Sequence, residues 1–213
     1  MKSPVLLLIV LIFFNSGNGY ATYSYLDKII KSPDNRVFIH LSPWEHNDNA
    51  AIILMTHDGV KVKKIKLNEI MTDDDREQYA ISTAGIDWYI NSISFFSKNH
   101  NYFIIRLRWG KIVAINLTEM KVHLTIENGL IDEVFDMSRQ IALSLLKSED
   151  PKERQTGAIA CGQLKVKESI SSLKFLLRDD SYEYEVDYLT KKRTKKYYVR
   201  RAAEAALKLI GEH

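Results

Sequence analysis

The sequence has 213 residues, of which 46% are hydrophobic and 27% are charged. This composition is ordinary for a folded globular protein, and the length is enough for one large domain or two small ones. The formal net charge is only +3, which excludes a strong overall field for attracting anions, so any strongly basic segment acts locally.

The first 21 residues have the pattern of a bacterial secretory signal peptide. Lys2 supplies a positive start, an unbroken apolar run extends from Val5 to Phe14, and Ala21 ends a polar stretch in which small residues flank a larger one. The alternative is an N-terminal membrane anchor, but ten apolar residues are too few to cross the bilayer core comfortably. We therefore expect an exported protein, periplasmic or extracellular, that is not an integral membrane protein once the signal peptide is removed.

Residues 36–122 are expected to form an antiparallel meander of about six strands. Along the first of these strands the apolar residues alternate, which places Val37, Ile39 and Leu41 on one face. Residues 57–59, His-Asp-Gly, lie between two alternating runs. Asp-Gly in that setting is a strong indication of a hairpin turn.

The strand after this turn changes parity, because Val60 and Val62 share one face whereas Ile65 and Leu67 have the other. We expect a β-bulge near residues 63–64 to reconcile the two halves.

Residues 68–88 are then expected to form a polar connection that contains about one helical turn. Strands resume after it, and Trp109-Gly110-Lys111 marks a further turn between two of them.

After Gly129 the apolar spacing becomes helical. A first helix is predicted around a stripe formed by Val134, Met137, Ile141 and Leu145. The lone cysteine, Cys161, lies on the apolar side of the next helix, so we expect a buried side chain rather than a nucleophile.

That next helix has a clear predicted start. Asp150 can cap its N-terminus, Pro151 occupies the first helical position, and Glu153 completes a box-like Asp-x-x-Glu motif. A further amphipathic helix is expected over residues 168–177. The last helix has the most regular apolar stripe and ends at Gly211.

Two of these helices resemble each other: ERQTGAIACGQL (153–164) and VRRAAEAALKLI (199–210) share an arginine, then small residues, then a larger apolar pair. The second resembles the first-helix signature of HEAT-like repeats, in the variant found in phycobilisome lyases. The first is a weaker match, in which Gly157 and Gln163 replace the usual Ala and Lys. This resemblance covers residues 137–211. It implies stacked helix pairs and a role in protein interaction, and it carries no catalytic assignment.

Residues 33–124 are similar, more loosely, to the blade-like β-segments of exported bacterial proteins, with too few strands for a closed propeller. The fold class expected is α+β, an N-terminal antiparallel β-meander domain followed by C-terminal HEAT-like helical repeats with an inserted β-hairpin. The expected boundaries are a signal peptide at 1–21, a β domain at 22–133 and a helical domain at 134–213 with its insertion at 181–197.

The insertion contains the most basic stretch of the chain, KKRTKKYYVRR (191–201), with seven basic residues and no acid. Before it, Tyr182 and Tyr184 alternate with Glu183 and Glu185, so the segment is expected to form a hairpin that neutralises part of the positive charge. The candidate partner-binding residues are Lys191, Lys192, Arg193, Lys195, Lys196, Arg200 and Arg201.

Three interpretations of this stretch remain open: a solvated or partly paired hairpin, a contact for an anionic partner, or a nucleic-acid site. Nucleic acid is the least favoured, because its binding needs several unneutralised phosphate contacts along a track. An exported protein also meets little nucleic acid.

No P-loop, dinucleotide fingerprint or Gly-x-Ser-x-Gly motif is present, and the histidines do not pair at metal-ligand spacing. We therefore expect no cofactor, no metal and no enzymatic activity, but an exported protein-binding or scaffold protein whose partner is another protein or an anionic component of the cell envelope. The alternative is an exported hydrolase whose residues converge only in three dimensions, with His57, Asp58, Asp73 to Asp75 and His123 as candidates.

Overall fold

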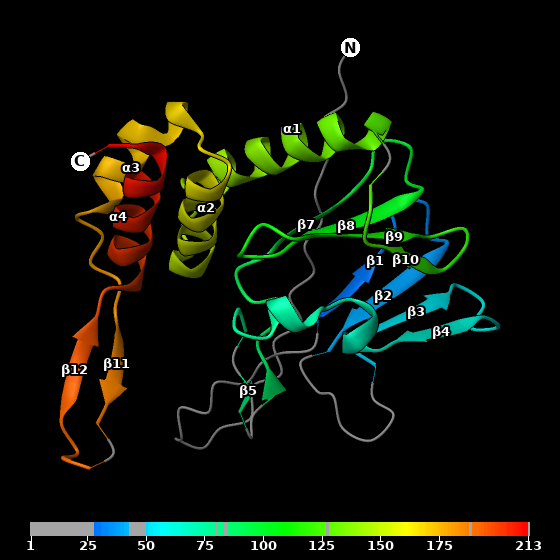
Figure 1. Cartoon of the computed structure of the whole chain (residues 1–213), viewed down its shortest axis with the longest axis horizontal. Coiled ribbons are helices and arrows are strands. Elements are labelled where there is room, and N and C mark those ends of the chain that lie inside the picture. Colours follow the sequence, from blue (N-terminus) through cyan, green and yellow to red (C-terminus); the bar gives the residue numbers. More distant parts are fainter. Residues whose placement is uncertain are drawn as a thin grey trace. The chain divides into compact units, whose positions relative to one another are not determined.

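The structure is a computed structural model that describes residues 28–42, 50–79, 81–82, 85–126, 128–187 and 189–212. The expected signal peptide lies outside these residues. The chain divides into two compact units, Met1–Trp88 and Tyr89–His213. It is of mixed α+β class, with antiparallel sheets followed by four helices (Figure 1).

The first unit is built on a four-stranded antiparallel sheet in the order β1-β2-β3-β4. Its strands are β1 (Lys28–Lys31), β2 (Val37–Leu41), β3 (Ile52–Thr56) and β4 (Val62–Ile65). The predicted face of β2 is confirmed, because Val37, Ile39 and Leu41 are all buried. The predicted turn between β3 and β4 is also present, with Gly59 in the left-handed region at φ +71°.

The predicted bulge in β4 is wrong. The pairing of β4 with β3 continues without interruption from Ile65 opposite Ile52 to Val62 opposite Met55. Val60 and Val62 are 83% and 53% exposed, so their side chains are not part of the core. Only Ile65, at the end of β4, and Leu67 after it are buried, and a regular strand therefore accommodates both halves of the pattern.

The polar connection contains two 3₁₀ turns, η1 (Leu67–Glu69) and η2 (Asp73–Asp75), and a small pairing of β5 (Ile81–Ser82) with β6 (Gly85–Ile86). The buried Asp75 accepts hydrogen bonds from Thr72 N at 2.7 Å and from Thr72 Oγ1 at 2.8 Å, which closes the η2 turn. Trp88 ends the unit in its core and donates from Nε1 to the carbonyl of Ser42 at 3.0 Å.

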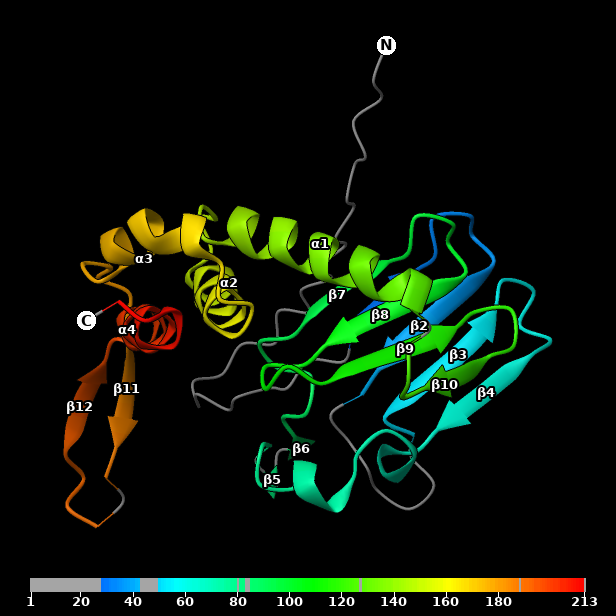
Figure 2. The same cartoon turned by 45° about the horizontal axis from the view of Figure 1, so that its top comes forward.

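The second unit begins with another four-stranded antiparallel meander, β7 (Ile93–Phe96), β8 (Tyr102–Arg106), β9 (Ile112–Asn116) and β10 (Lys121–His123), in the order β10-β9-β8-β7. The predicted turn at residues 109–111 joins β8 to β9, and Gly110 there has φ +92°. The expected single meander of about six strands is thus two separate sheets. In Figure 2 the strands of the first are coloured blue to cyan and those of the second green.

The helices of this unit are α1 (Asn128–Leu145), α2 (Pro151–Gln163), α3 (Ile170–Leu176), which follows the short turn η3 (Lys167–Ser169), and α4 (Tyr198–Ile210). The predicted cap of α2 is present, because the Asp150 carboxylate accepts from Lys152 N at 2.8 Å. Glu153 does not close a box on that cap but accepts from the hydroxyl of Ser148. Gly211 ends α4 at φ +95°, as its position predicts.

Two glycines allow α2 to pack closely on both sides. A Cβ on Gly157 would lie 2.8 Å from Leu146 N, and a Cβ on Gly162 would lie 2.7 Å from Ala206 Cα. Neither position has room for a side chain. Glycine at position 157 is therefore required by the close approach of α2 to the end of α1.

The second sheet shares its core with the helices. Ile93, Phe95, Ile104 and Ala114 form one hydrophobic cluster with residues of α1, α2, α3 and α4. The division of the chain at Trp88/Tyr89 therefore differs from the expected boundary at residues 133/134, which would cut through this cluster. Within the described ranges, no helix is both long enough and apolar enough to cross a membrane.

Candidate interaction surface

The basic stretch forms the second strand of an isolated hairpin in the second unit. β11 (Glu183–Val186) pairs antiparallel with β12 (Arg193–Lys196), with Glu183 opposite Lys196 and Val186 opposite Arg193. The two strands make a sheet of their own and extend away from α3 and α4, as the orange segment of Figure 1 shows. The predicted insertion is therefore a projecting hairpin between these two helices.

Asp187 shapes the tip of the hairpin. Its carboxylate accepts hydrogen bonds from Leu189 N at 2.9 Å and Thr190 N at 3.1 Å, and these bonds lower its pKa. Its own N–H donates to the Lys192 carbonyl at 2.9 Å. The turn therefore ends before Arg193, which already pairs with Val186 in the ladder.

One face of the hairpin combines tyrosines with positive charge. We call it the aromatic–basic face and define it as Tyr182, Tyr184, Val186, Arg193 and Lys195. Lys195 lies opposite Tyr184, and its Nζ is 4.1 Å from the centroid of the Tyr182 ring. Tyr182 and Tyr184 are 41% and 50% exposed, with ring centroids 5.3 Å apart. The hydrogen bond with Tyr184 and the charge of Lys195 lower the pKa of Tyr182.

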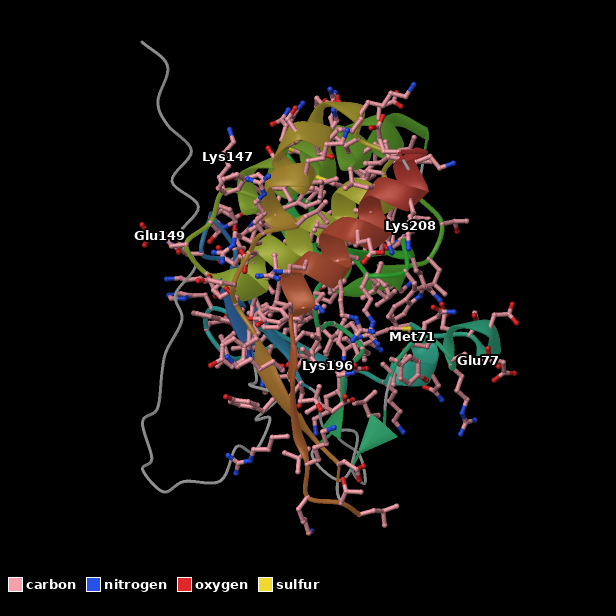
Figure 3. The ribbon with its side chains drawn as sticks, turned by 90° about the vertical axis from the view of Figure 1, so that its left-hand side faces the viewer. Met71, Glu77, Lys147, Glu149, Lys196 and Lys208 are labelled. Atoms are coloured by element: carbon pink, nitrogen blue, oxygen red, sulfur yellow. The ribbon has the colours of Figure 1, made fainter. Side chains whose placement is uncertain are left out.

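The opposite face of the hairpin carries opposed charges. Lys196 Nζ lies 2.8 Å from Glu185 Oε2, and both side chains are partly exposed. Figure 3 labels Lys196 on this strand pair. An exposed pair of this kind contributes little to stability, but it neutralises Lys196 and leaves the uncompensated charge on the other face and at the tip.

The root of the hairpin is held by two arginines, one from α2 and one from α4. Arg154 donates from Nε and Nη2 to Asp179 Oδ2, both at 2.8 Å, and from Nη1 to the carbonyls of Ser148 and Glu149. Arg200 donates from Nε to the Asp179 carbonyl, and its guanidinium lies 4.1 Å from the ring centroid of Tyr197. The root therefore consists of structural contacts that fix where the hairpin leaves the helices.

Asp179 stays ionised in this setting. Removal of its carboxylate from water disfavours the charge, but hydrogen bonds from Ser181 and Arg154 and the positive charge of Arg154 outweigh that cost and lower its pKa. A lowered pKa means that the ionised carboxylate, relative to its protonated form, is more stable in the folded state than in the unfolded state.

The seven candidate residues occupy five different environments. Arg193 and Lys195 belong to the aromatic–basic face, Lys191 and Lys192 form the exposed tip, Lys196 is ion-paired on the opposite face, Arg200 binds at the root, and Arg201 is exposed on α4. Arg200 is therefore a structural residue rather than a free contact. Tyr182 and Tyr184 were not among the candidates, although their strict alternation with glutamates placed them together on one face.

The residues of the hydrolase alternative have local roles. His57 stacks on Phe38 with ring centroids 5.9 Å apart, and Asp58 accepts from Thr56 Oγ1 at 2.6 Å within the turn. His123 lies in the other unit, edge-on to Tyr102. Among the side chains in the described ranges, no group of three or more His, Cys, Asp or Glu is arranged to hold a metal ion.

Cys161 is fully buried, as its helical position predicts, and burial raises the pKa of its thiol to about 11. The side chain is therefore protonated at neutral pH and packs as a small apolar group.

The first unit contains a hollow of about 250 Å³ beside η1 and η2. Asp73 and Arg76 bring opposite charges to its lining, next to Met71 and Tyr79. Because both charges are present, the lining indicates neither an anionic nor a cationic ligand. The hollow therefore suggests a function less clearly than the hairpin does.

Comparisons with protein families, with curated proteins and with solved structures found no match to this chain. The function is therefore argued from the hairpin itself.

Proposed function

We propose that this chain is an exported, non-enzymatic binding or scaffold protein, and that the aromatic–basic face of its hairpin contacts an acidic surface of another protein. The observation that carries this proposal is the exposed tyrosine pair on a hairpin that stands apart from the rest of its unit. Tyrosine and arginine are enriched in the energetic centres of protein interfaces, where charged residues other than arginine are depleted.

The hairpin depends on specific contacts for its stability, which a surface without a function would not require. An isolated two-stranded hairpin is marginally stable in water, and here it is anchored by the Arg154–Asp179 ion pair and by Arg200. Its side chains on the aromatic–basic face pack on one another rather than on a core. A surface that is held in place and left exposed is suited to contact a partner.

The partner's charge follows from the hairpin. Lys191, Lys192, Arg193 and Lys195 are all exposed on the tip and on the aromatic–basic face, whereas the ion pair with Glu185 uses Lys196. Complementary charge steers association and selects partners. An acidic protein surface therefore fits this face.

The HEAT-like interpretation belongs to the same proposal. α2 contacts α4 through small residues, with Gly162 against Ala206, and the equivalent arginines Arg154 and Arg200 both reach Asp179. Stacking through small residues and repetition of a position are features of helical repeats. They support a short repeat unit that carries the hairpin between its last two helices.

The test is site-specific photocrosslinking in the native cells. A benzophenone side chain replaces Tyr184 in one variant and Val60, which is exposed in the first unit, in a matched control. We expect Tyr184 to yield one discrete protein adduct that disappears when Lys195→Glu is added, and Val60 to yield none. Equal adducts at both positions, or adducts unaffected by Lys195→Glu, would refute the proposal.

Export is tested separately. A fusion of residues 1–30 to a reporter that is active only outside the cytoplasm should be active, and the Val5–Phe14 run should be required for that activity. An inactive fusion would remove the exported location and leave the hairpin contact to be judged on the crosslinking result.

A further inference from the structure

Both edges of the hairpin are open. Among the described residues, β11 and β12 pair only with each other. Their side chains are exposed, except those of Glu183 and Lys196 at the root end, which are half-buried. An open edge presents unpaired N–H and C=O groups, to which another extended chain can add as a further strand.

The register shows which backbone groups point outward. Asp187 N donates to the Lys192 carbonyl at 2.9 Å, so these two residues form a hydrogen-bonded pair. Opposed pairs in an antiparallel ladder alternate between hydrogen-bonded and non-hydrogen-bonded. The next pair, Val186 with Arg193, is therefore non-hydrogen-bonded, and Lys195, two positions further along β12, repeats this arrangement. The backbone N–H and C=O groups of Arg193 and Lys195 thus point away from β11, toward the open edge of β12.

The side chains of these two residues share the aromatic–basic face, because positions two apart along a strand lie on the same face. A strand added to β12 in antiparallel order would place one residue directly opposite Arg193 and another, two positions away, directly opposite Lys195. Cβ atoms opposed in this way are about 4.5–5.5 Å apart, and opposite charges at such positions attract each other. The edge therefore favours an extended segment with acidic residues at alternate positions.

The inner edge of β12 already holds a strand of this pattern. β11 carries Glu183 and Glu185 at alternate positions, and Lys196 Nζ lies 2.8 Å from Glu185 Oε2. The outer edge of β11 offers carboxylates and no cation, so it does not attract a further acidic strand. Charge thus selects the edge of β12 and the sign of the incoming strand.

A second copy of this chain does not fit the edge. A second hairpin added in the same direction would lie about 10 Å from the first, twice the strand spacing. That is less than the width of the helices at the root, since one helix alone is about 10–12 Å across. In the opposite direction, antiparallel pairing sets β12 against β12 with like charges opposed, which is unfavourable. The occupant is therefore a segment of another protein.

We propose that the open edge of β12 adds an extended acidic segment of the partner protein as a third, antiparallel strand. This inference rests on the proposed function and specifies that the partner is bound through its backbone as well as through its carboxylates. Charged side chains, lysine above all, keep an open edge from pairing indiscriminately. Here Arg193 and Lys195 restrict the edge to strands of opposite charge.

The probe is a fluorescein-labelled peptide, Thr-Glu-Val-Glu-Val-Glu-Thr, whose binding to the purified protein is measured by fluorescence anisotropy. In antiparallel pairing, the glutamates that face Arg193 and Lys195 also direct their N–H groups at β12, whereas the valines direct theirs away. N-methylation of the glutamates removes these donors and keeps every carboxylate, and N-methylation of the valines is the matched control. We expect the glutamate-methylated peptide to bind about tenfold or more weakly than the unmodified peptide, because backbone hydrogen bonds supply the affinity of strand addition. The valine-methylated peptide should bind as the unmodified peptide does.

A protein variant assigns the binding to β12. Lys195→Glu should abolish binding of the unmodified peptide, whereas Lys147→Glu, at an exposed lysine that follows α1, should leave it unchanged. If Lys195→Glu does not fold, the methylated peptides decide, because they need only the parent protein.

The proposal is overturned if the unmodified peptide does not bind, or if the glutamate-methylated peptide binds as tightly as the unmodified one. This failure is distinct from that of the proposed function. A crosslink from Tyr184 that requires Lys195, together with equal binding of the methylated and unmodified peptides, would retain the acidic partner and remove strand addition.

Discussion

At the scale of single residues, Asp179 joins two helices to the hairpin. Its carboxylate accepts hydrogen bonds from Arg154 and its carbonyl accepts one from Arg200, so one residue binds an arginine of α2 and an arginine of α4. Both side chains of the Arg154–Asp179 pair are largely buried. Loss of one partner of a buried pair leaves the other charge uncompensated, which costs more than loss of an exposed pair.

Asp179→Asn is therefore expected to lower the free energy of unfolding by about 2 kcal/mol, the scale of a hydrogen bond to a charged group. Urea denaturation of residues 22–213 measures the change. The matched control is Asp180→Asn, because Asp180 is the exposed neighbour and should change stability by less than about 0.5 kcal/mol. Equal effects in the two variants would show that the ion pair contributes nothing specific.

The pH dependence follows from the same residue. The pKa of Asp179 is lowered from its ordinary value of 3.8 in the folded state, so the unfolded state takes up its proton first as the pH falls. The stability from this carboxylate is complete above the ordinary pKa and is lost as the pH falls through the lower, folded value. Between pH 5 and pH 2 the parent should lose more stability than Asp179→Asn. Parallel curves for the two proteins would contradict this assignment.

At the scale of elements, close packing of α2 depends on its glycines. Gly162 meets the backbone of α4, whereas Gly129, near the start of α1, has open space around its Cβ position. The same substitution should therefore have opposite effects at the two sites. Overpacking destabilises, whereas replacement of a helical glycine by alanine at an open site stabilises.

We expect Gly162→Ala to lower the free energy of unfolding by about 1–3 kcal/mol and Gly129→Ala to raise it by about 0.5–1 kcal/mol. Chemical denaturation of both variants measures the two changes. A neutral Gly162→Ala would mean that α2 and α4 separate readily and do not form a tightly packed pair.

How much of the fold the sequence could predict depends on how local each determinant is. The β2 face, the Asp150 cap and the Gly211 stop were predictable because each rests on a few adjacent residues. β1 was missed because it is short, only Lys28–Lys31, and its apolar residues do not alternate. Alternation also cannot state which sheet a strand joins, so two meanders were predicted as one.

The site shows the same limit. The hairpin and its charges were predictable from alternation and from the basic run, but the role of Arg200 was not. Arg200 donates a hydrogen bond to the carbonyl of Asp179, which is 21 positions away in the sequence. Such a contact joins residues distant in sequence and leaves no local pattern.

At the scale of the whole molecule, charge limits the partners. The net charge is +3 over 213 residues, so the basic character of the hairpin is a local property and not a field of the entire protein. Tight nucleic-acid binding requires many unneutralised cations along a track. The hairpin pairs Lys196 with Glu185 and commits Arg200 to its root, so a few cations at the tip and on one face remain.

The change of Lys191, Lys192 and Arg193 together to Ser tests this conclusion. All three side chains are exposed, so folding should survive, with a change in stability of within about ±0.5 kcal/mol for each substitution. Binding to the acidic protein partner should weaken, and its salt dependence should become shallower, because fewer counterions are released.

For DNA and RNA we expect dissociation constants above about 1 µM at physiological salt, in the parent as in the variant, since non-specific binding lies in that range. Fluorescence anisotropy with labelled oligonucleotides measures them. Tighter binding by the parent that is lost in the triple variant would show that the tip grips phosphates, and the acidic-protein partner would then have to be abandoned.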